Sequence, residues 1–187
     1  MDDTNNLADH FLIAMPGLQD PNFAHTVTYV CEHNDQGTMG IVVNRPMKLQ
    51  LGDMLEQLEI QPTDPEAATL PVYLGGPVQT DRGFVLHSDD RRWDSTMRVT
   101  AEVSVTTSKD ILEAIAGGRG PEHTLIALGY AGWSRGQLDA EMGANAWLSG
   151  PANSEILFRM PAEQRWLAAA RLLGVDMNLL SGEAGHA

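Results

Sequence analysis

Cysteine and long hydrophobic runs are both scarce in this sequence. Cys31 is the only cysteine among 187 residues, so no intramolecular disulfide can form. The first apolar run extends from Phe11 to Met15 and is far shorter than the roughly 20 apolar residues that a membrane-spanning helix requires. The polar residues before this run do not fit a secretory signal. We therefore predict a cytoplasmic protein that has no membrane partner.

Basic residues are also few. Lys and Arg together number 12 against 25 Asp and Glu residues, which gives a formal net charge of −13. The only lysines are Lys48 and Lys109, and the longest basic run is Arg91-Arg92. Nucleic acids are held largely by clustered Lys and Arg side chains, so this composition argues against direct nucleic-acid binding. An acidic surface likewise disfavours binding to an anionic membrane.

The common motifs of metal and nucleotide sites are missing. The six histidines show no HExxH or paired spacing, and neither a P-loop pattern nor GxGxxG occurs. We therefore predict no metal and no cofactor, although folding could still bring Cys31, His33 and His87 together. Cys31 itself is typical of a buried apolar side chain, and the alternative is a reactive thiol.

Length and composition are those of one globular domain. A chain of 187 residues with 43% hydrophobic and 20% charged residues can bury roughly 70% of the surface that its unfolded form exposes. We expect residues 1–10 to be a flexible N-terminus and residues 11–178 to form a single domain. Residues 179–187 are expected to be a flexible C-terminal tail.

Short apolar runs predict more strands than helices. The turn 34–37 separates two of these runs and indicates a hairpin. Helical periodicity is found at 51–58, 111–115 and 161–173. Because strands and helices do not alternate regularly, we predict an α+β domain with a mixed sheet. The predicted strands are 11–15, 27–33, 39–44, 71–74, 84–87, 97–100, 103–106 and 124–128, with further extended pieces at 147–151 and 155–158.

The segment from Gly129 to Leu148 is the most distinctive part of the chain. The glycines between 129 and 132 are expected to end the preceding strand, and Ser134 with Gln137 fits a capping box at the start of a helix. The unpaired amides of the first helical turn could then face a ligand. Ser134 is not expected to be a nucleophile, because it lacks a GxSxG surrounding and capping accounts for it.

An arginine at the end of a predicted strand is the first candidate binding residue. In Asn44-Arg45-Pro46 the proline favours an extended backbone at Arg45, whose guanidinium could clamp a carboxylate or a phosphate. The alternative is a structural ion pair with a carboxylate such as Glu141. Gly75 and Gly76 could likewise expose amides to a ligand, or could serve backbone geometry alone.

Polar side chains on the predicted helix are the second candidate. Gln137 and Glu141 stand four residues apart on one helical face, with Trp133 near the helix entrance and Asn145 one turn beyond. These side chains could form a pocket wall over an aromatic floor, or could tie loops together inside the protein. The complete set of candidate cleft residues is Asn44, Arg45, Gly75, Gly76, Trp133, Ser134, Gln137, Glu141 and Asn145.

Four sequence blocks, in this order, resemble the YqgE/AlgH family. They are FLIAMP at 11–16, GIVVNRP at 40–46, LGGPV leading to GFVLHS at 74–88, and the segment 129–148. The resemblance implies an α+β fold whose mixed, bifurcated sheet closes into a pseudo-barrel flanked by helices. It implies no activity, since none is established for the family, although one member is described as a regulator of alginate synthesis.

Three functional hypotheses follow. The first is a bacterial regulatory domain that binds an unknown small molecule or protein without catalysis, so that the family label of transcriptional regulation describes an indirect effect. The second is a small enzyme for an anionic substrate, with Arg45 as clamp, helix amides as an oxyanion site and Glu141 as acid or base. The third is direct DNA-binding regulation, which comes only with the family label and conflicts with the net charge.

Overall fold

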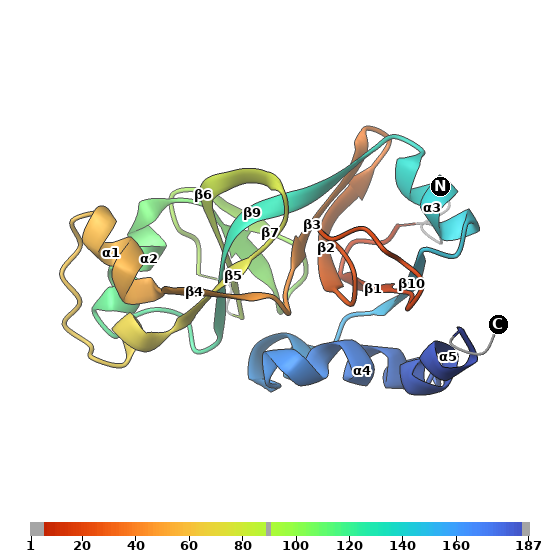
Figure 1. Cartoon of the computed structure of the whole chain (residues 1–187). Helices are drawn as coiled ribbons and strands as arrows, with labels where there is room; N and C mark the ends of the chain where they lie inside the picture. The colour runs from red at the N-terminus through yellow and green to blue at the C-terminus, as the bar shows by residue number, and fades with distance from the viewer. Residues whose placement is uncertain (1–5, 89–90, 185–187) are drawn as a thin grey trace.

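A branched β-sheet forms the centre of the protein. The computed structural model describes residues 6–88 and 91–184, and the strands in these ranges join in one ten-stranded sheet. Figure 1 shows two groups of strands, with α1 and α2 beside one group and α3, α4 and α5 beside the other. The long strand β9 runs from one group into the other and belongs to both (Figure 1).

The elements alternate irregularly along the chain, as expected for an α+β protein. The helices are α1 (Leu51–Gln57), α2 (Lys109–Ala116), α3 (Gln137–Gly143), α4 (Ala162–Leu172) and α5 (Met177–Ala184), with the short helical turns η2 (Ala67–Thr69) and η3 (Glu155–Arg159). The strands are β1 (His10–Ala14), β2 (Val27–Asn34), β3 (Gly37–Val42), β4 (Pro46–Gln50), β5 (Pro71–Leu74), β6 (Val78–His87), β7 (Thr96–Arg98), β8 (Ser104–Thr106), β9 (Thr124–Ser134) and β10 (Trp147–Pro151).

Strand β9 is the branch point of the sheet. Its first part pairs antiparallel with β6 and parallel with β5, whereas residues 131–134 pair antiparallel with β3. From β3 the sheet continues through β2 and β1 to β10; from β6 it continues through β8 to β7, and β4 pairs with β5. The predicted mixed, bifurcated sheet is therefore confirmed, since β5 supplies a parallel pair and β3 and β5 diverge from β9.

Two adjacent glycines allow three strands to meet at this branch. The Gly75 N–H donates to the Leu128 carbonyl of β9, and the Gly75 carbonyl accepts from the Val42 N–H of β3, each at 2.8 Å. A Cβ atom on Gly76 would lie 2.1 Å from the carbonyl carbon of Tyr130, where no side chain can fit. Backbone geometry thus accounts for the Gly75-Gly76 pair. This was one of the two alternatives that the sequence left open for these glycines.

Apolar side chains cover both faces of the sheet. One face carries a continuous cluster that includes Tyr29, Leu86 and Val105 and is closed by Leu157 of η3 and Ala170 of α4. The opposite face carries two separate clusters, one beneath α1 and α2 and the other beneath α3. The sheet curls around the continuous cluster as a half-barrel flanked by helices, which agrees with the predicted pseudo-barrel (Figure 1).

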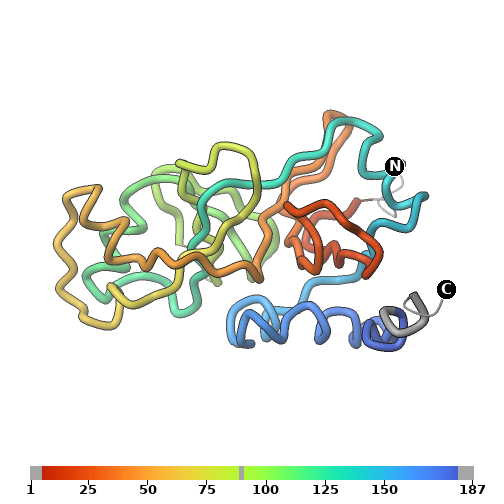
Figure 2. Tube along the Cα trace, in the orientation of Figure 1, coloured from red at the N-terminus to blue at the C-terminus, as the bar shows by residue number. Residues whose placement is uncertain are grey.

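Helix α4 is fixed to the sheet by two polar side chains. The buried Arg165 donates through Nη1 to the Val43 carbonyl, and its guanidinium carbon lies 5.2 Å from the centre of the Tyr73 ring. Trp166 Nε1 donates to the Ala14 carbonyl at 2.8 Å. Because β1 also pairs with β10, segments near the two ends of the chain lie side by side, and the termini are found at the same end of the molecule (Figure 2).

The structure differs from the sequence prediction in several elements. The predicted hairpin at 34–37 is confirmed, but β4 was not predicted. Strand β9 continues through the glycines to Ser134 because residues 130–134 pair with β6 and β3, and Gly129 accommodates a positive φ of 80° within it. Residues 155–158 form the helical turn η3 rather than an extended piece, and Asn153 Oδ1 accepts from the Ile156 N–H at its start. Part of the expected C-terminal tail is helix α5, while residues 185–187 lie outside the described ranges.

Candidate functional site

The guanidinium of Arg45 is bonded to backbone. Its Nη1 donates to the carbonyl oxygens of Pro21 and Asn22 at 2.8 and 2.7 Å, and Nη2 donates to the Ala24 carbonyl at 2.9 Å. Burial lowers the pKa of Arg45, and the Asp20 carboxylate opposes that lowering. These three bonds do not fit the predicted anion clamp, and the alternative ion pair with Glu141 is wrong because the two side chains have other partners.

Asn44 holds the other end of the same loop, residues 20–26. Its Oδ1 accepts from the Val27 N–H and its Nδ2 donates to the His25 carbonyl, each at 2.9 Å. In the middle of the loop, the Phe23 ring lies 5.9 Å from Trp133 and 5.5 Å from Trp147, measured between ring centres. Asn44 and Arg45 therefore shape a loop that covers two tryptophans.

Glu141 joins those two tryptophans to helix α3. Its Oε1 accepts from Trp133 Nε1 at 3.2 Å and from Trp147 Nε1 at 2.9 Å, while Oε2 accepts from Gln137 Nε2 at 2.9 Å. Both indoles are buried, so Glu141 satisfies two polar groups that would otherwise lack a partner. This arrangement agrees with the interpretation that these residues tie loops together inside the protein. It does not agree with a role for Glu141 as an acid or base, because both carboxylate oxygens already accept hydrogen bonds.

The predicted capping box at Ser134 is confirmed in one half only, because Gln137 reaches back to Ser134 but Ser134 does not cap helix α3. Helix α3 begins three residues later, after Gly136, whose positive φ of 78° turns the chain into the helix. As predicted, the Gln137 side chain reaches back: its Oε1 accepts from the Ser134 amide at 3.0 Å, and it also accepts from the Ser134 hydroxyl at 3.2 Å. Asn145 follows the end of α3 at a φ of 62°, a left-handed conformation that asparagine tolerates better than most residues.

The nine candidate residues do not form one cleft. Trp133 lines one hollow and Ser134 another, and neither hollow is lined by Asn44 or Arg45. Gly75 and Gly76 are enclosed at the branch of the sheet. Asn44 and Arg45 bond to the backbone of loop 20–26, and Phe23 of this loop contacts Trp133 on the other side. Two of the four sequence blocks, 40–46 and 129–148, therefore meet around this loop, where their contacts are internal.

The residues considered for a metal site have other partners. His33 Nδ1 lies 2.7 Å from Thr38 Oγ1, and His87 Nε2 lies 2.8 Å from Thr106 Oγ1. Within residues 6–88 and 91–184, no group of three His, Cys, Asp or Glu side chains is placed to hold a metal ion. Cys31 is buried on the face of the continuous cluster, which confirms its interpretation as an apolar core residue.

Cys31 is expected to resist thiol reagents in the folded protein. Burial raises its pKa, with a smaller contribution from Glu32, so the reactive thiolate is disfavoured at neutral pH. Labelling by a chromogenic disulfide reagent should be at least about 100-fold slower in the native protein than in denaturant, because it requires local opening. Equal rates in the two conditions would show that the thiol is accessible and would restore the reactive-thiol interpretation.

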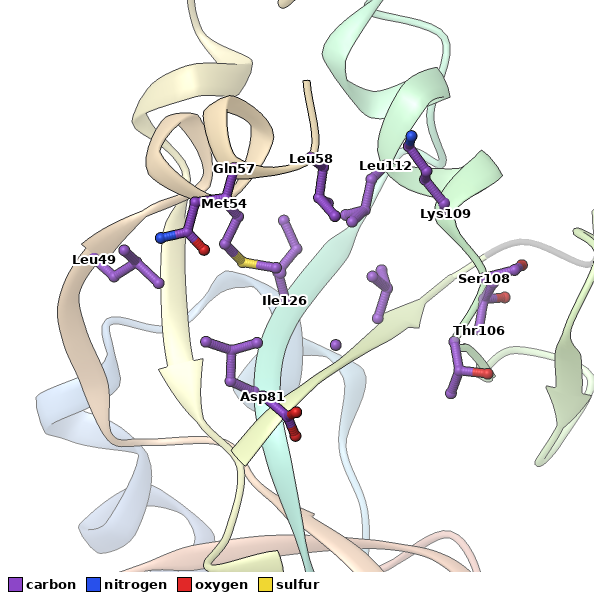
Figure 3. Close-up of a pocket in the computed structure, with 14 residues that line it drawn as sticks. Leu49, Met54, Gln57, Leu58, Asp81, Thr106, Ser108, Lys109, Leu112 and Ile126 are labelled. Atoms are coloured by element: carbon purple, nitrogen blue, oxygen red, sulfur yellow. The ribbon is translucent and has the colours of Figure 1, made fainter. Parts of the chain in front are cut away.

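A cavity between α1, α2 and the sheet is a better candidate site, and we call it the α1–α2 cavity. It has a volume of about 280 Å³ and lies on the face opposite the continuous cluster. Figure 3 shows side chains of both helices and of β6 and β9 around it, with Asp81 on one side and Lys109 on another. Its apolar lining consists of Leu49, Met54, Leu58, Val85, Leu112, Ile126 and Leu128; the polar lining includes Gln57, Asp81, Thr106, Thr107, Ser108 and Lys109.

Two features keep the α1–α2 cavity open. Gly83 of β6 has no side chain, and a Cβ placed there would contact only Met54 Cε, at 3.7 Å. Leu58, after the end of α1, is 36% exposed although it belongs to the helix's apolar stripe. The sequence analysis recognised the helical periodicity at 51–58 but did not identify the cavity. The available signal was a glycine within a strand, which often marks a close approach or an open space.

Comparison with known proteins establishes the family. A family model described as AlgH-like (DUF179) matches residues 11–178. The chain is 60% identical over 184 residues to the UPF0301 protein Tgr7_2910 of Thioalkalivibrio sulfidiphilus, with 98% of both chains covered. It is 56% identical over 179 residues to a UPF0301 protein of Nitrosococcus oceani, with 96% of both covered. The chain belongs to the AlgH-like family, which confirms the resemblance found in the sequence.

Solved structures agree with the fold described above. The solution structure of the AlgH protein from Pseudomonas aeruginosa has a TM-score of 0.82 and 53% identity, and the match covers 100% of this chain and 99% of that chain. The crystal structure of protein DIP2367 from Corynebacterium diphtheriae has a TM-score of 0.76 over 97% of this chain and 94% of that chain. At 20% identity, the second likeness concerns the fold alone. In residues 6–88 and 91–184, no helix has the length and apolar character needed to span a membrane.

Proposed function

We propose that the protein is a ligand-binding regulatory domain without a reaction of its own, and that the α1–α2 cavity holds the ligand. The observation that carries this proposal is an apolar hollow with charged side chains at its edge. Small-molecule sites commonly combine an apolar interior with a few polar groups that orient the ligand. The residues first suspected of forming a site have internal hydrogen-bond partners, so the cavity is the stronger candidate.

The cavity suits a compact amphipathic molecule. Met54, Leu112 and Ile126 offer apolar contact, whereas Asp81 and Lys109 offer charges of opposite sign. Among the described residues, neither charged side chain has a hydrogen-bond or ion-pair partner, so both are available to polar groups of a ligand. The ligand we propose has an apolar body that enters the cavity and a polar end that stays near its edge.

A regulatory role would follow from binding alone. Occupancy of the cavity would join α1 and α2 through a shared ligand and would stabilise this end of the protein. We propose that the protein acts in the cytoplasm. The family label suggests an effect on transcription, and we propose that any such effect is indirect. The net charge of −13 supports this view, because DNA would be repelled by most of the surface.

Filling the α1–α2 cavity should weaken ligand binding at least about tenfold while preserving the fold. In Gly83→Val, the new side chain enters the hollow, where the first added atom meets nothing closer than 3.7 Å. With the fluorescent amphipathic anion anilinonaphthalene sulfonate as probe, we expect saturable binding to the parent protein and at least about tenfold weaker binding to Gly83→Val, equivalent to about 1.4 kcal/mol. Lys109→Gln should also weaken binding of this anion.

Titration by fluorescence, with melting curves as a check on folding, makes the comparison. Gly17→Ala is the matched control, because a Cβ at Gly17 has no atom within 4 Å and this residue does not line the cavity. The proposal fails if folded Gly83→Val binds the probe as tightly as the parent protein. A thermal-shift screen of a metabolite panel on the parent protein and on Gly83→Val extends the test to natural ligands. A ligand of the cavity must raise the melting temperature of the parent protein but not that of Gly83→Val.

A further inference from the structure

An open groove runs along the other face of the sheet and shares only Thr107 with the lining of the α1–α2 cavity. It combines two hollows of about 490 and 410 Å³ that share Glu32, Met39 and Phe84. One wall comes from the β2–β3 hairpin and the other from β6, β7 and β8. The groove is therefore elongated, and it crosses the gap between two arms of the half-barrel.

The floor of the groove is apolar and adaptable. Met39 and Met97 pack against the continuous cluster but remain partly exposed, and methionine side chains adjust readily to different partners. The rings of Phe84 and Tyr130 meet edge to face, with 5.6 Å between their centres. Arg82 lies over Phe84 at 5.4 Å from the ring centre. Such a floor can receive apolar side chains without selecting a single shape.

An unpaired strand edge borders this floor. Among the described residues, strand β7 pairs only with β8. The bonds from the Val99 N–H to the Val103 carbonyl and from the Thr107 N–H to the Ser95 carbonyl show which backbone groups of β7 face β8. In an antiparallel pair these groups alternate, so those of Thr96 and Arg98 point away from β8. Across the ranges that the structure describes, these outward groups have no hydrogen-bond partner, and an added strand could bond to them.

The charges around the groove favour a basic partner. Glu32 and Asp94 stand on opposite walls, and within residues 6–88 and 91–184 neither carboxylate has a cationic partner. Arg82, a cation of the described lining, is directed at its own wall, where its guanidinium contacts Gln79 and Thr107 at 3.3 and 3.5 Å. A lysine or arginine side chain entering the groove would therefore meet carboxylates first.

We propose that this groove binds an extended segment of a partner protein, which adds a strand to the edge of β7. Main-chain bonds to Thr96 and Arg98 would supply affinity, as in other cases of strand addition. Apolar side chains of the segment would rest on Met39, Met97 and Phe84, and an adjacent Lys or Arg would lie between Glu32 and Asp94. The occupant is therefore a protein segment that alternates apolar and basic residues.

Peptide binding to β7 variants tests the main-chain part of this proposal. The probes are fluorescein-labelled ten-residue peptides in which Val or Leu alternates with Lys, Thr or Glu, and the measurement is fluorescence anisotropy. Arg98→Pro removes an outward N–H without removing a β7–β8 bond, so affinity should fall about tenfold or more. Arg98→Ala is the matched control: it also loses the exposed side-chain bond to the Thr100 carbonyl but keeps the N–H, and it should bind like the parent protein.

A second pair of variants tests the charge part independently of β7. The parent should prefer lysine-bearing over glutamate-bearing peptides by about tenfold or more, and Glu32→Gln with Asp94→Asn should reduce this preference to about threefold or less. Glu163→Gln, an exposed change on α4, should keep it. The proposal is overturned if no peptide binds the parent protein. It is also overturned if a folded Arg98→Pro keeps the affinity of the parent protein and the charge variant keeps its preference for lysine-bearing peptides.

Discussion

Replacing Gly76 with alanine is expected to leave the protein largely unfolded. A Cβ at this position would lie 2.1 Å from the carbonyl carbon of Tyr130 and 2.2 Å from its oxygen, and both atoms belong to the backbone of β9. A side chain could rotate away, but these atoms cannot move without breaking the branch of the sheet. The cost should exceed about 4 kcal/mol, which is a large part of the roughly 5–15 kcal/mol that stabilises a typical domain.

Soluble yield, circular dichroism and denaturant unfolding measure this effect. Gly143→Ala is the matched control, because a Cβ there has no atom within 4 Å and the residue ends helix α3. Alanine at Gly143 should be neutral or stabilise the protein by up to about 1 kcal/mol. If Gly76→Ala melts within a few degrees of the parent protein, the contact between Gly76, just after β5, and Tyr130 of β9 is not as tight as described.

The second large effect is expected from Glu141→Ala. This change leaves the indole N–H groups of Trp133 and Trp147 inside the protein without their carboxylate acceptor, and it frees Gln137. Each buried donor left unsatisfied costs about 1–3 kcal/mol, so we expect a total loss of about 2–4 kcal/mol. For a chain of this length, the melting temperature should fall by about 10 °C.

Urea unfolding followed by tryptophan fluorescence makes the test, because the two indoles are themselves the reporters. Glu141→Gln is the matched variant: it retains an oxygen for both indoles but loses the carboxylate's bond to Gln137, so its loss should be about half that of Glu141→Ala or less. A catalytic role for Glu141 would give a different pattern, with normal stability and lost activity. A Glu141→Ala protein as stable as the parent would contradict the structural role that we assign.

The sequence predicted those parts of the fold that depend on local patterns. Apolar runs bounded by turn residues located most strands, and the turn at 34–37 located the hairpin. The pattern failed at β9, where Gly129 looks like a strand end because glycine is typical of turns. In the folded chain, strands on both sides hold Gly129 within β9. Residues 155–158 failed for another reason, since a short apolar run fits a strand or a helical turn equally well.

The candidate site was harder to predict, because it depends on partners that are distant in sequence. Arg45 binds carbonyls of loop 20–26, and nothing near Arg45 in the sequence specifies them. For Glu141 the correct alternative was available, but only the placement of Trp147 beside Trp133 shows why the carboxylate is internal. The α1–α2 cavity exists partly because Gly83 has no side chain opposite the two helices. Hydrophobic periodicity in the sequence shows which residues face inward, but it cannot show where space is left unfilled.

The shared strand β9 also governs when the chain can fold during synthesis. Until residues 124–134 emerge from the ribosome, β3 can pair only with β2, and β6 has no partner before β8 is made. Both groups of strands then expose unpaired edges, which are the usual starting points for aggregation. Folding is therefore completed late in translation, and the two groups of strands cannot be separated or exchanged as independent modules.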